Sequence, residues 1–391
     1  MSAAPVAAAL DGIRVLDFST VGPAARCARI LADYGAEVVK IGAPKKPGLQ
    51  IEPAHWAYGA GRGTKRIRID LKAREGREAF LRLVGQADVV LESFRPGVSK
   101  KLGVGYADAS RVNPRVIYCS TSGYGQTGPA SGWAGHDLDY LAIGGFLHMS
   151  GRNADGRPGL PGATIADAAA GGMQAAIAIL AALLRRARTG RGEFLDVSVA
   201  EGVLSLMALQ IDEHLATGAD PGPGHDVLSG RFACYGVYGT RDGQWLAIGA
   251  IEAAFWANLC RCLGLERWIP HQYDDAQQER IRADLSAAFR TRDRDDWVAE
   301  LAPADTCVAP VLSVSELPRF PQFQARDVFA EVEHPQHGRF RQLAPVLAGA
   351  SRPEPVARVP SAATSDAEPL LRAAGYAARE IEALLGAGTV A

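Results

Sequence analysis

Acid–base side chains gather in the glycine-rich stretch between residues 123 and 167. His136 is followed directly by Asp137, and Asp167 opens the longest helical pattern of the chain, AAAGGMQAAIAILAALLRRA. A histidine and a carboxylate that face one reacting carbon can act as opposed acid and base. Such a pair suits proton removal next to a carbonyl, because one group takes the proton and the other returns it.

Asp167 also has a simpler structural interpretation. A carboxylate at the start of a helix accepts hydrogen bonds from unpaired backbone N–H groups and interacts favourably with the helix dipole, so Asp167 could serve only as an N-cap. Glu252 ends the apolar segment LAIGAIE and is the best candidate to orient the imidazole of His136. The sequence pattern alone does not bring these groups together.

The remaining histidines and cysteines do not predict a metal site. A proline lies between His334 and His337, which is typical of a turn, and Cys260 and Cys262 stand two residues apart on a helical pattern and point in different directions. The six cysteines of the chain form no CxxC pair, and the first residues lack the pattern of a signal peptide, so we expect reduced thiols and a cytoplasmic protein.

Three glycines at positions 123, 125 and 128 spell GxGxxG directly after a predicted strand. In a dinucleotide site the third glycine lies in the first turn of a helix. Here Pro129, Ser131 and Gly132 continue a loop. We therefore expect no NAD or FAD at this motif.

Composition excludes several classes of partner. The chain of 391 residues is 48% hydrophobic and 22% charged, as in ordinary globular proteins, and its net charge of −1 gives no electrostatic reason to expect nucleic acid or an anionic membrane. The uncharged run from Ala168 to Leu184 is shorter than the roughly 20 residues of a membrane span and contains Gln174. We interpret it as a buried or interface helix, with no membrane span.

The first part of the chain alternates strand and helix patterns. Apolar strands are predicted at Ile13–Phe18, Ala36–Gly42, Lys65–Lys72, Asp88–Ser93 and Arg115–Ser120, with helical segments after the first and third of them. Such βαβ units build an α/β fold with a parallel sheet, right-handed crossovers and ligand loops at the carboxyl ends of the strands.

Basic residues collect near those predicted strand ends, where they favour a phosphate-bearing ligand over ordinary surface charge. They are Lys40, Lys45, Lys46, Lys65, Lys72, Arg95, Lys100 and Lys101.

The chain divides into four predicted segments. Residues 1–217 are predicted to form the first part of a large α/β domain, and residues 218–230 are predicted to be a linker. Residues 231–306 form a small α+β domain that begins with a hairpin turning at Arg241, Asp242 and Gly243. Residues 307–391 return to the large domain and end in a pair of helices.

The motifs of the whole chain resemble those of the class III CoA-transferases and α-methylacyl-CoA racemases, the CaiB/BaiF type. The shared motifs are LDGIRVLDFS, VGP, LADYGAEVVKIGAP, RIDLK, SFRPGVSKKLGVG, SGYGQTGP, TGRGEFLDVSVAEG and GYAAREIEALLGAG. Three further motifs, GHDLDYLAIGG at 135–145, GAIE at 249–252 and DTCVAPVL at 305–312, resemble the racemase branch.

The resemblance implies a Rossmann-like large domain, a smaller domain and an interlocked homodimer whose active sites combine both chains. It implies an acyl-CoA thioester as substrate and no prosthetic group. His136 and Asp167 match the two groups that exchange the α-proton of the thioester through an enolate. The enolate oxygen is then held by backbone N–H near Asp137, and Glu252 arrives from the partner chain.

Positions that match contacts to coenzyme A follow the third and fourth predicted strands and surround the histidine. They are Ile69, Asp70, Leu71, Lys72, Ser93, Phe94, Arg95, Lys101, Gly135, Leu138, Asp139 and Tyr140. The arginine that often follows the second strand in racemases is Ala43 here, and Lys45 and Lys46 are its possible replacements.

The alternative activity is transfer of coenzyme A between an acyl-CoA and a carboxylic acid. Asp167 would then act as a nucleophile and form an aspartyl-CoA thioester. The segment SGYGQTGP is closer to transferases than to racemases. The transferase reaction leaves His136 without a necessary role, so we rank it second.

Overall fold

The computed structural model describes residues 7–44, 59, 61–350, 356–361 and 363–391. The chain forms two compact units. The first consists of Met1–Phe146, Pro161–Leu209 and Gln324–Ala391, and the second of Leu147–Leu160 and Gln210–Phe323. The two units are described separately below.

The first unit is built on one large sheet. Its strands are β1 (Arg14–Asp17), β2 (Glu37–Gly42), β3 (Lys65–Arg68), β4 (Val89–Glu92), β5 (Ile117–Ser122) and β6 (Phe194–Ser198). All neighbouring strands are parallel, in the order β3-β2-β1-β4-β5-β6. This is the strand order of doubly wound nucleotide-binding folds, and it confirms the predicted Rossmann-like α/β class.

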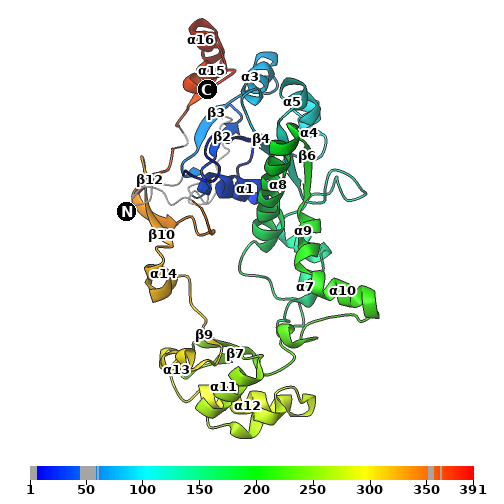
Figure 1. Ribbon diagram of the computed structural model, residues 1–391, viewed down its shortest axis with the longest axis vertical. Helices are drawn as coiled ribbons and strands as arrows, with labels where there is room; N and C mark the ends of the chain where they lie inside the picture. Colours follow the sequence, from blue (N-terminus) through cyan, green and yellow to red (C-terminus); the bar gives the residue numbers. More distant parts are fainter. Residues whose placement is uncertain (1–6, 45–58, 60, 351–355, 362) are drawn as a thin grey trace. The chain divides into compact units, whose positions relative to one another are not determined.

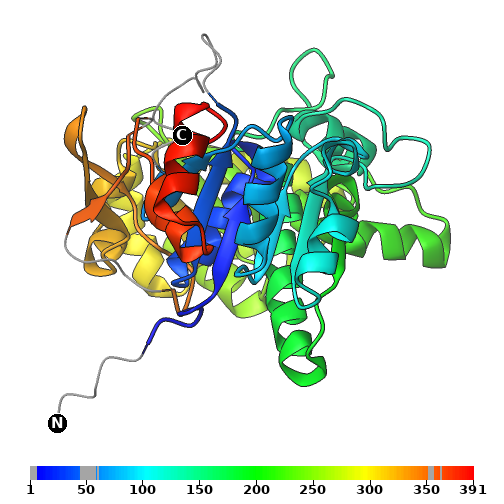
Figure 2. The ribbon, with the colours of Figure 1, turned by 90° about the horizontal axis from the view of Figure 1, so that it is seen from above.

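Helices cover both faces of this sheet (Figure 1, Figure 2). The helices that supply buried side chains to the two apolar clusters on the sheet are α1 (Gly22–Asp33), α3 (Arg74–Val84), α5 (Tyr106–Val112), α8 (Gln174–Thr189), α15 (Ala367–Ala373) and α16 (Ala378–Gly386). The other helices are α4 (Val98–Leu102), α6 (Asp137–Ile143), α7 (Phe146–Met149), α9 (Val199–Leu206), α10 (Ala208–Thr217) and α14 (Pro321–Ala325). Of these, α7, α10 and α14 each include residues of both units.

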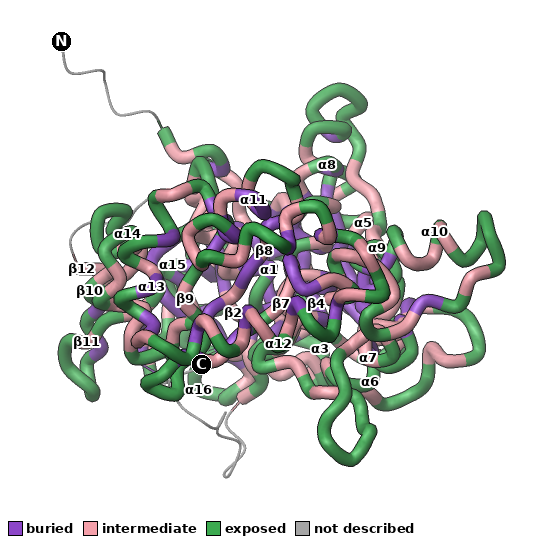
Figure 3. The backbone as a smooth tube through the Cα atoms, turned by 90° about the horizontal axis from the view of Figure 1, so that it is seen from below, coloured by how far each residue is buried: buried purple, intermediate pink, exposed green. Residues whose placement is uncertain are grey.

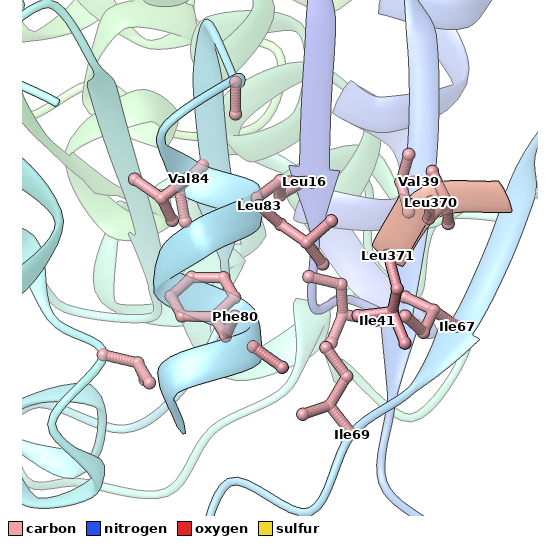
Figure 4. Close-up of a cluster of buried hydrophobic side chains, with 14 of the residues drawn as sticks. Leu16, Val39, Ile41, Ile67, Ile69, Phe80, Leu83, Val84, Leu370 and Leu371 are labelled. Atoms are coloured by element: carbon pink, nitrogen blue, oxygen red, sulfur yellow. The ribbon is translucent and has the colours of Figure 1, made fainter. Parts of the chain in front are cut away.

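The alternation of side chains along each strand explains the two helical layers, because successive residues of a strand point to opposite faces. Leu16 and Val39 pack on one face with α3, α5, α15 and α16, a cluster shown in Figure 4. Val15 and Val38, their neighbours in sequence, pack on the other face with α1 and α8. Burial of these apolar side chains holds the loops at the strand ends in place.

The C-terminal part of the chain returns to the first unit with a sheet that the sequence pattern did not predict. β10 (Phe329–His334), β11 (Gly338–Leu343) and β12 (Val356–Arg358) lie in the order β11-β10-β12. The two predicted C-terminal helices follow as α15 and α16.

The second unit has its own sheet and core. β7 (Tyr235–Gly239), β8 (Trp245–Gly249) and β9 (Val308–Pro310) form an antiparallel sheet, and the chain turns between β7 and β8 at the predicted residues 241–243. α11 (Ala253–Cys262), α12 (Gln278–Phe289) and α13 (Arg294–Leu301) supply buried side chains, including Trp256 and Phe289. Because β9 pairs with β8, this unit extends beyond the segment 231–306 into residues 307–323.

One helical stretch, Ala166–Thr189, is long and apolar enough to cross a membrane by length and composition. In the structure, Ala175, Ala176, Ile179 and Ala182 of this stretch pack in the core beneath the large sheet. Near its end Arg186 donates to Asp88 at 2.7 Å. These contacts favour the interpretation of the stretch as a core helix with one exposed face (Figure 3).

Candidate active site

Asp167 lies at the start of a helix with unusual geometry. The segment η1 (Ala166–Met173) is π-helical and continues directly into α8. The predicted helix therefore exists and ends at Thr189 as expected, but its first two turns are wider than an α-helix. π-helical turns are rare and often occur at functional sites.

Glycines allow η1 to approach its neighbours at backbone distance. A Cβ atom at Gly171 would lie 2.5 Å from Cβ of Pro23 in α1, and one at Gly172 would lie 2.8 Å from Cβ of Arg26. On the other side, a Cβ atom at Gly202 of α9 would lie 2.0 Å from the Ala170 carbonyl oxygen. The carboxylate-bearing segment is thus held between α1 and α9 with no space for side chains.

Gly202→Ala is expected to destabilise the protein by about 1–3 kcal/mol, because the added methyl group overlaps the η1 backbone and forces it to move. Urea unfolding monitored by circular dichroism measures the change. Gly386→Ala is the matched control, since this helical glycine has nothing within 4 Å of the added atom and the substitution is expected to leave stability equal or slightly higher. Equal stability of the two variants would contradict the packing described for η1.

A direct contact joins the two predicted aspartates. The backbone N–H of Asp167 donates to Oδ1 of Asp137 at 2.8 Å, although the residues are 30 positions apart. Asp137 is the first residue of α6, and His136 is the N-cap of that helix. The backbone N–H of His136 donates to Oδ2 of Asp139 at 2.9 Å, which fixes the start of α6. The contact brings the helix start that carries His136 against Asp167.

The environment of Asp167 disfavours its charged form. Burial raises the pKa of the Asp167 carboxyl above its ordinary value, and the negative charge of Asp137 raises it further. The positive charges of Arg26 and of protonated His136 act in the opposite direction without cancelling the increase in pKa. A carboxyl group with a raised pKa is a stronger base than an ordinary aspartate, which suits it to take and return protons.

Asp167→Asn is expected to increase the free energy of unfolding at neutral pH. A carboxyl whose pKa is higher in the folded than in the unfolded protein binds more protons when folded, so its contribution to stability falls as the pH rises from the ordinary aspartate pKa through the raised one. Asparagine carries no charge and escapes this loss. Urea unfolding at neutral pH and at a pH below the ordinary aspartate pKa measures the effect, which should disappear in acid. Exposed Asp11→Asn is the control, and an unchanged difference in acid would contradict the assignment.

Aromatic rings support the loop in front of α6. The Tyr140 hydroxyl donates to the Gly135 carbonyl oxygen at 2.6 Å, and burial raises the Tyr140 pKa to about 12. The Tyr124 ring contacts those of Tyr140 and Trp133, with centroids 5.3 and 5.8 Å away. A Cβ atom at Gly135 would lie 2.7 Å from both tyrosines, so the glycine lets the loop rest on the rings.

Eight of the twelve residues predicted to contact coenzyme A follow the carboxyl ends of β3 and β4, as expected for a doubly wound fold, and the other four lie at the start of α6. Ile69 is buried and Asp70 accepts from the backbone N–H of Lys72 at 3.0 Å, so the former is a core residue and the latter shapes the loop. Lys72, Ser93, Arg95 and Lys101 are exposed, and Leu71 is partly buried.

Phe94 packs against Phe18, and Arg95 lies near α6. The Phe94 ring lies 5.4 Å from the Phe18 ring, centroid to centroid. The positive charge of Arg95 lowers the Tyr140 pKa against the larger effect of burial, so Arg95 is close enough to act on the α6 region. Leu138 and Asp139 are exposed on the first turn of α6. Contact of these residues with coenzyme A stays a prediction.

Two predicted assignments depend on other parts of the chain. Glu252 is exposed at the N-cap of α11 in the second unit, whereas His136 and Asp167 belong to the first, and its role towards His136 stays a prediction. Lys45 and Lys46, the proposed replacements for an arginine at Ala43, lie outside the described residues. Within the described part of the chain, no group of three or more His, Cys, Asp or Glu side chains could hold a metal ion.

Arg26 is the residue of this cluster that the sequence analysis missed. It lies on α1 one turn after Gly22, and a Cβ atom at Gly22 would be 3.9 Å from Oδ2 of Asp167. A guanidinium group of Arg26 donates to the Thr164 hydroxyl at 2.7 Å. The sequence held one signal for Arg26. It follows Gly22 of the VGP motif by four residues, and residues four apart lie on one face of a helix.

A doubly wound α/β unit that presents a poised carboxylate, a second carboxylate and a histidine at one helix junction has the features of an enzyme. The sequence profile described as CoA-transferase family III matches residues 10–363. The chain therefore belongs to CoA-transferase family III.

Relatives of both catalytic types are similar to this chain. The alpha-methylacyl-CoA racemase of Homo sapiens is 35% identical over 310 residues, 79% of each chain. The succinyl-CoA:glutarate CoA-transferase of Mus musculus is 30% identical over 377 residues, 92% of this chain and 83% of the relative. A crystal structure of a CAIB/BAIF family protein from Brucella suis superimposes with a TM-score of 0.75 at 29% identity, covering 93% of this chain and 98% of that one.

Proposed function

We propose that this enzyme epimerises 2-methylacyl-CoA thioesters by proton transfer at the carbon next to the thioester. Asp167 and His136 act as the two bases on opposite faces of that carbon, and one returns a proton after the other has removed one. The intermediate is an enolate, whose oxygen is assigned to backbone N–H near Asp137. The chemistry requires no prosthetic group, and the acyl-CoA is the substrate.

The observation that carries this proposal is the hydrogen bond between the Asp167 backbone N–H and the Asp137 carboxylate. It sets the helix start with His136 beside a carboxyl whose pKa is raised by burial and by Asp137. Two groups at one junction that can each take and return a proton are what exchange of a weakly acidic C–H proton requires. Similarity to racemases at 35% and 32% identity supports the same reaction.

Transfer of coenzyme A is the second candidate. Several transferases are also similar to this chain, among them a succinyl-CoA--D-citramalate CoA-transferase from Chloroflexus aurantiacus at 31% identity. In that reaction the Asp167 carboxylate attacks the thioester carbonyl and coenzyme A thiolate leaves. The thiolate then attacks the aspartyl carbonyl of the mixed anhydride, which releases the first acyl group as its carboxylate and gives an aspartyl-CoA thioester. The acceptor carboxylate repeats the two steps in reverse, which forms the new acyl-CoA and restores the Asp167 carboxylate.

Proton NMR in D₂O separates the two reactions. The enzyme is incubated with one enantiomer of a 2-methylacyl-CoA, with and without a free carboxylic acid. We expect loss of the α-proton signal and appearance of the other enantiomer without any added acid. A new acyl-CoA that forms only with the acid, and no α-proton exchange, would overturn the racemase proposal in favour of transfer.

We propose further that two chains form a homodimer in which Glu252 of the partner subunit orients His136. Exposed leucines and isoleucine support the pairing: Ile177 and Leu184 of α8 are 67% and 70% exposed, and Leu209 and Leu215 of α10 are 59% and 76% exposed. Light scattering should give the mass of two chains. Mixed Asp167→Asn and Glu252→Gln chains, unfolded and refolded together, should regain activity that neither variant has alone.

A further inference from the structure

Arg26 is a positive charge at the acid–base cluster that the proposed proton transfer does not use. Its side chain is exposed on α1. In the described part of the chain it forms no ion pair with a carboxylate, and its recorded hydrogen bond goes to Oγ1 of Thr164. A guanidinium group has five N–H donors, so most of the hydrogen-bonding capacity of Arg26 is free.

Three contacts fix the place of this side chain. Thr164 is the hydrogen-bond partner of Arg26 through its hydroxyl group. Its backbone carbonyl oxygen accepts the Ala168 N–H at 3.0 Å, so Thr164 belongs to the helical turn that contains Asp167. A Cβ atom at Gly172 would touch both the Arg26 Cβ and the Asp167 carbonyl oxygen, at 2.8 and 3.0 Å. Arg26 therefore lies on the α1 surface beside the first turns of η1, close to Asp167.

The local charges explain what Arg26 could bind. Asp137 and Asp167 place two carboxylates at the junction, and the positive charge of Arg26 opposes the rise of the Asp167 pKa. A further anion from the substrate would be repelled there without a cation to receive it. Arginine is suited to this task because its planar fork binds a carboxylate through two parallel hydrogen bonds.

We propose that Arg26 determines substrate specificity by binding a free carboxylate on the acyl group. The preferred substrate is then a monothioester of a 2-methyl dicarboxylic acid, rather than a purely hydrocarbon acyl-CoA. This inference rests on the proposed proton transfer at Asp167 and adds the chemical class of the acyl group. Thr164 holds the guanidinium in position, and the remaining N–H groups receive the carboxylate.

The test compares substrates that differ only in this charge. 2-Methylsuccinyl-CoA and 2-methylglutaryl-CoA, each with the thioester next to the methyl-bearing carbon, are paired with their methyl esters at the far carboxyl. Isothermal titration calorimetry measures binding to the full-length wild-type protein. We expect at least one diacid to bind about 10- to 100-fold more tightly than its ester, the range of a charge-assisted hydrogen-bonded pair.

Variants of Arg26 identify the residue responsible. Arg26→Met should remove the preference for the diacid while changing affinity for the ester by less than about threefold, and Arg26→Lys should keep part of the preference because it keeps the charge. Arg111→Met is the control, since exposed Arg111 on α5 pairs with Asp108 and should keep the full preference. Equal affinity of the wild type for every diacid and its ester, or an equal loss for both in Arg26→Met, would overturn the inference.

Exchange of the α-proton in D₂O, measured on the same substrates, separates this inference from the proposed function. Tighter diacid binding that depends on Arg26, together with rapid exchange, supports both. The same binding preference without exchange leaves the carboxylate site in place and rejects the racemase reaction. Exchange of the esters at the same efficiency as the diacids supports the reaction and rejects the role of Arg26.

Discussion

Asp167→Asn is expected to lower the rate of α-proton exchange by about 10²–10⁴-fold, the usual contribution of a positioned base, for the enantiomer of a 2-methylacyl-CoA whose α-proton faces Asp167. Asparagine has a similar shape, so the η1 backbone and its hydrogen bond to Asp137 should remain. The loss should appear mainly in kcat, because the substituted group acts on the reacting carbon and not on coenzyme A. Proton NMR in D₂O measures the rate.

The matched control is Asp11→Asn, an exposed aspartate of the same unit with no place in the cluster. It should exchange the α-proton at the wild-type rate. Exchange of both enantiomers by a folded Asp167→Asn protein within about threefold of wild type would exclude Asp167 as a base, given the expected size of a general-base contribution.

His136→Gln is expected to stop racemisation while leaving exchange of one enantiomer. With two bases on opposite faces, Asp167 alone can still remove the proton from the enantiomer that presents it and return deuterium to the same face. That enantiomer should lose its α-proton signal with retention of configuration, and the other should stay unlabelled. Asp167→Asn should show the opposite preference in any residual exchange. Chiral chromatography of the hydrolysed acids measures the configuration, and NMR measures the loss of the α-proton.

The transferase reaction predicts a different result for this variant. If Asp167 is a nucleophile, His136→Gln should leave coenzyme A transfer near the wild-type rate, and neither enantiomer should exchange its α-proton. His214→Gln is a control on the helix α10, outside the cluster. Racemisation by His136→Gln at the wild-type rate would contradict its role as the second base.

The large sheet could be predicted because its sequence signal is strong and local. Most strands are short apolar runs between polar loops, and β4 and β5 are buried at every position, as parallel strands between two helical layers must be. The bounds agree within a few residues except at β3, which ends at Arg68 although the apolar alternation continues to Leu71. Ile69 there makes an isolated antiparallel bridge with Val390.

Other elements depend on contacts that no local pattern carries. The strand GRFRQL of β11 has no buried residue, so its composition resembles a loop, and it is a strand because it pairs with β10. The π-helical form of η1 reflects close packing of Gly171 and Gly172 against α1, which becomes visible only in three dimensions.

In the candidate site, too, features with a local sequence signal could be predicted, and contacts between distant residues could not. Asp167 could be singled out because a carboxylate opens a long apolar helix, and His136 because an acid follows it. The sequence did not predict that Asp137 accepts from the Asp167 backbone or that Arg26 reaches Thr164, since both contacts join residues far apart in the chain. The family resemblance suggested the pairing of His136 with Asp167 as two bases, which stays a prediction.

The close contacts of Gly171, Gly172 and Gly202 have a consequence for how new specificities could arise in this scaffold. A helix held at backbone distance on two sides cannot shift to accommodate a larger acyl group, since any side chain added at these glycines would collide with a neighbour. Adaptation to new substrates is therefore restricted to outward-pointing positions around the helix start, such as Arg26 and Thr164. A mutant library aimed at altered selectivity should vary those exposed positions and keep the three glycines fixed.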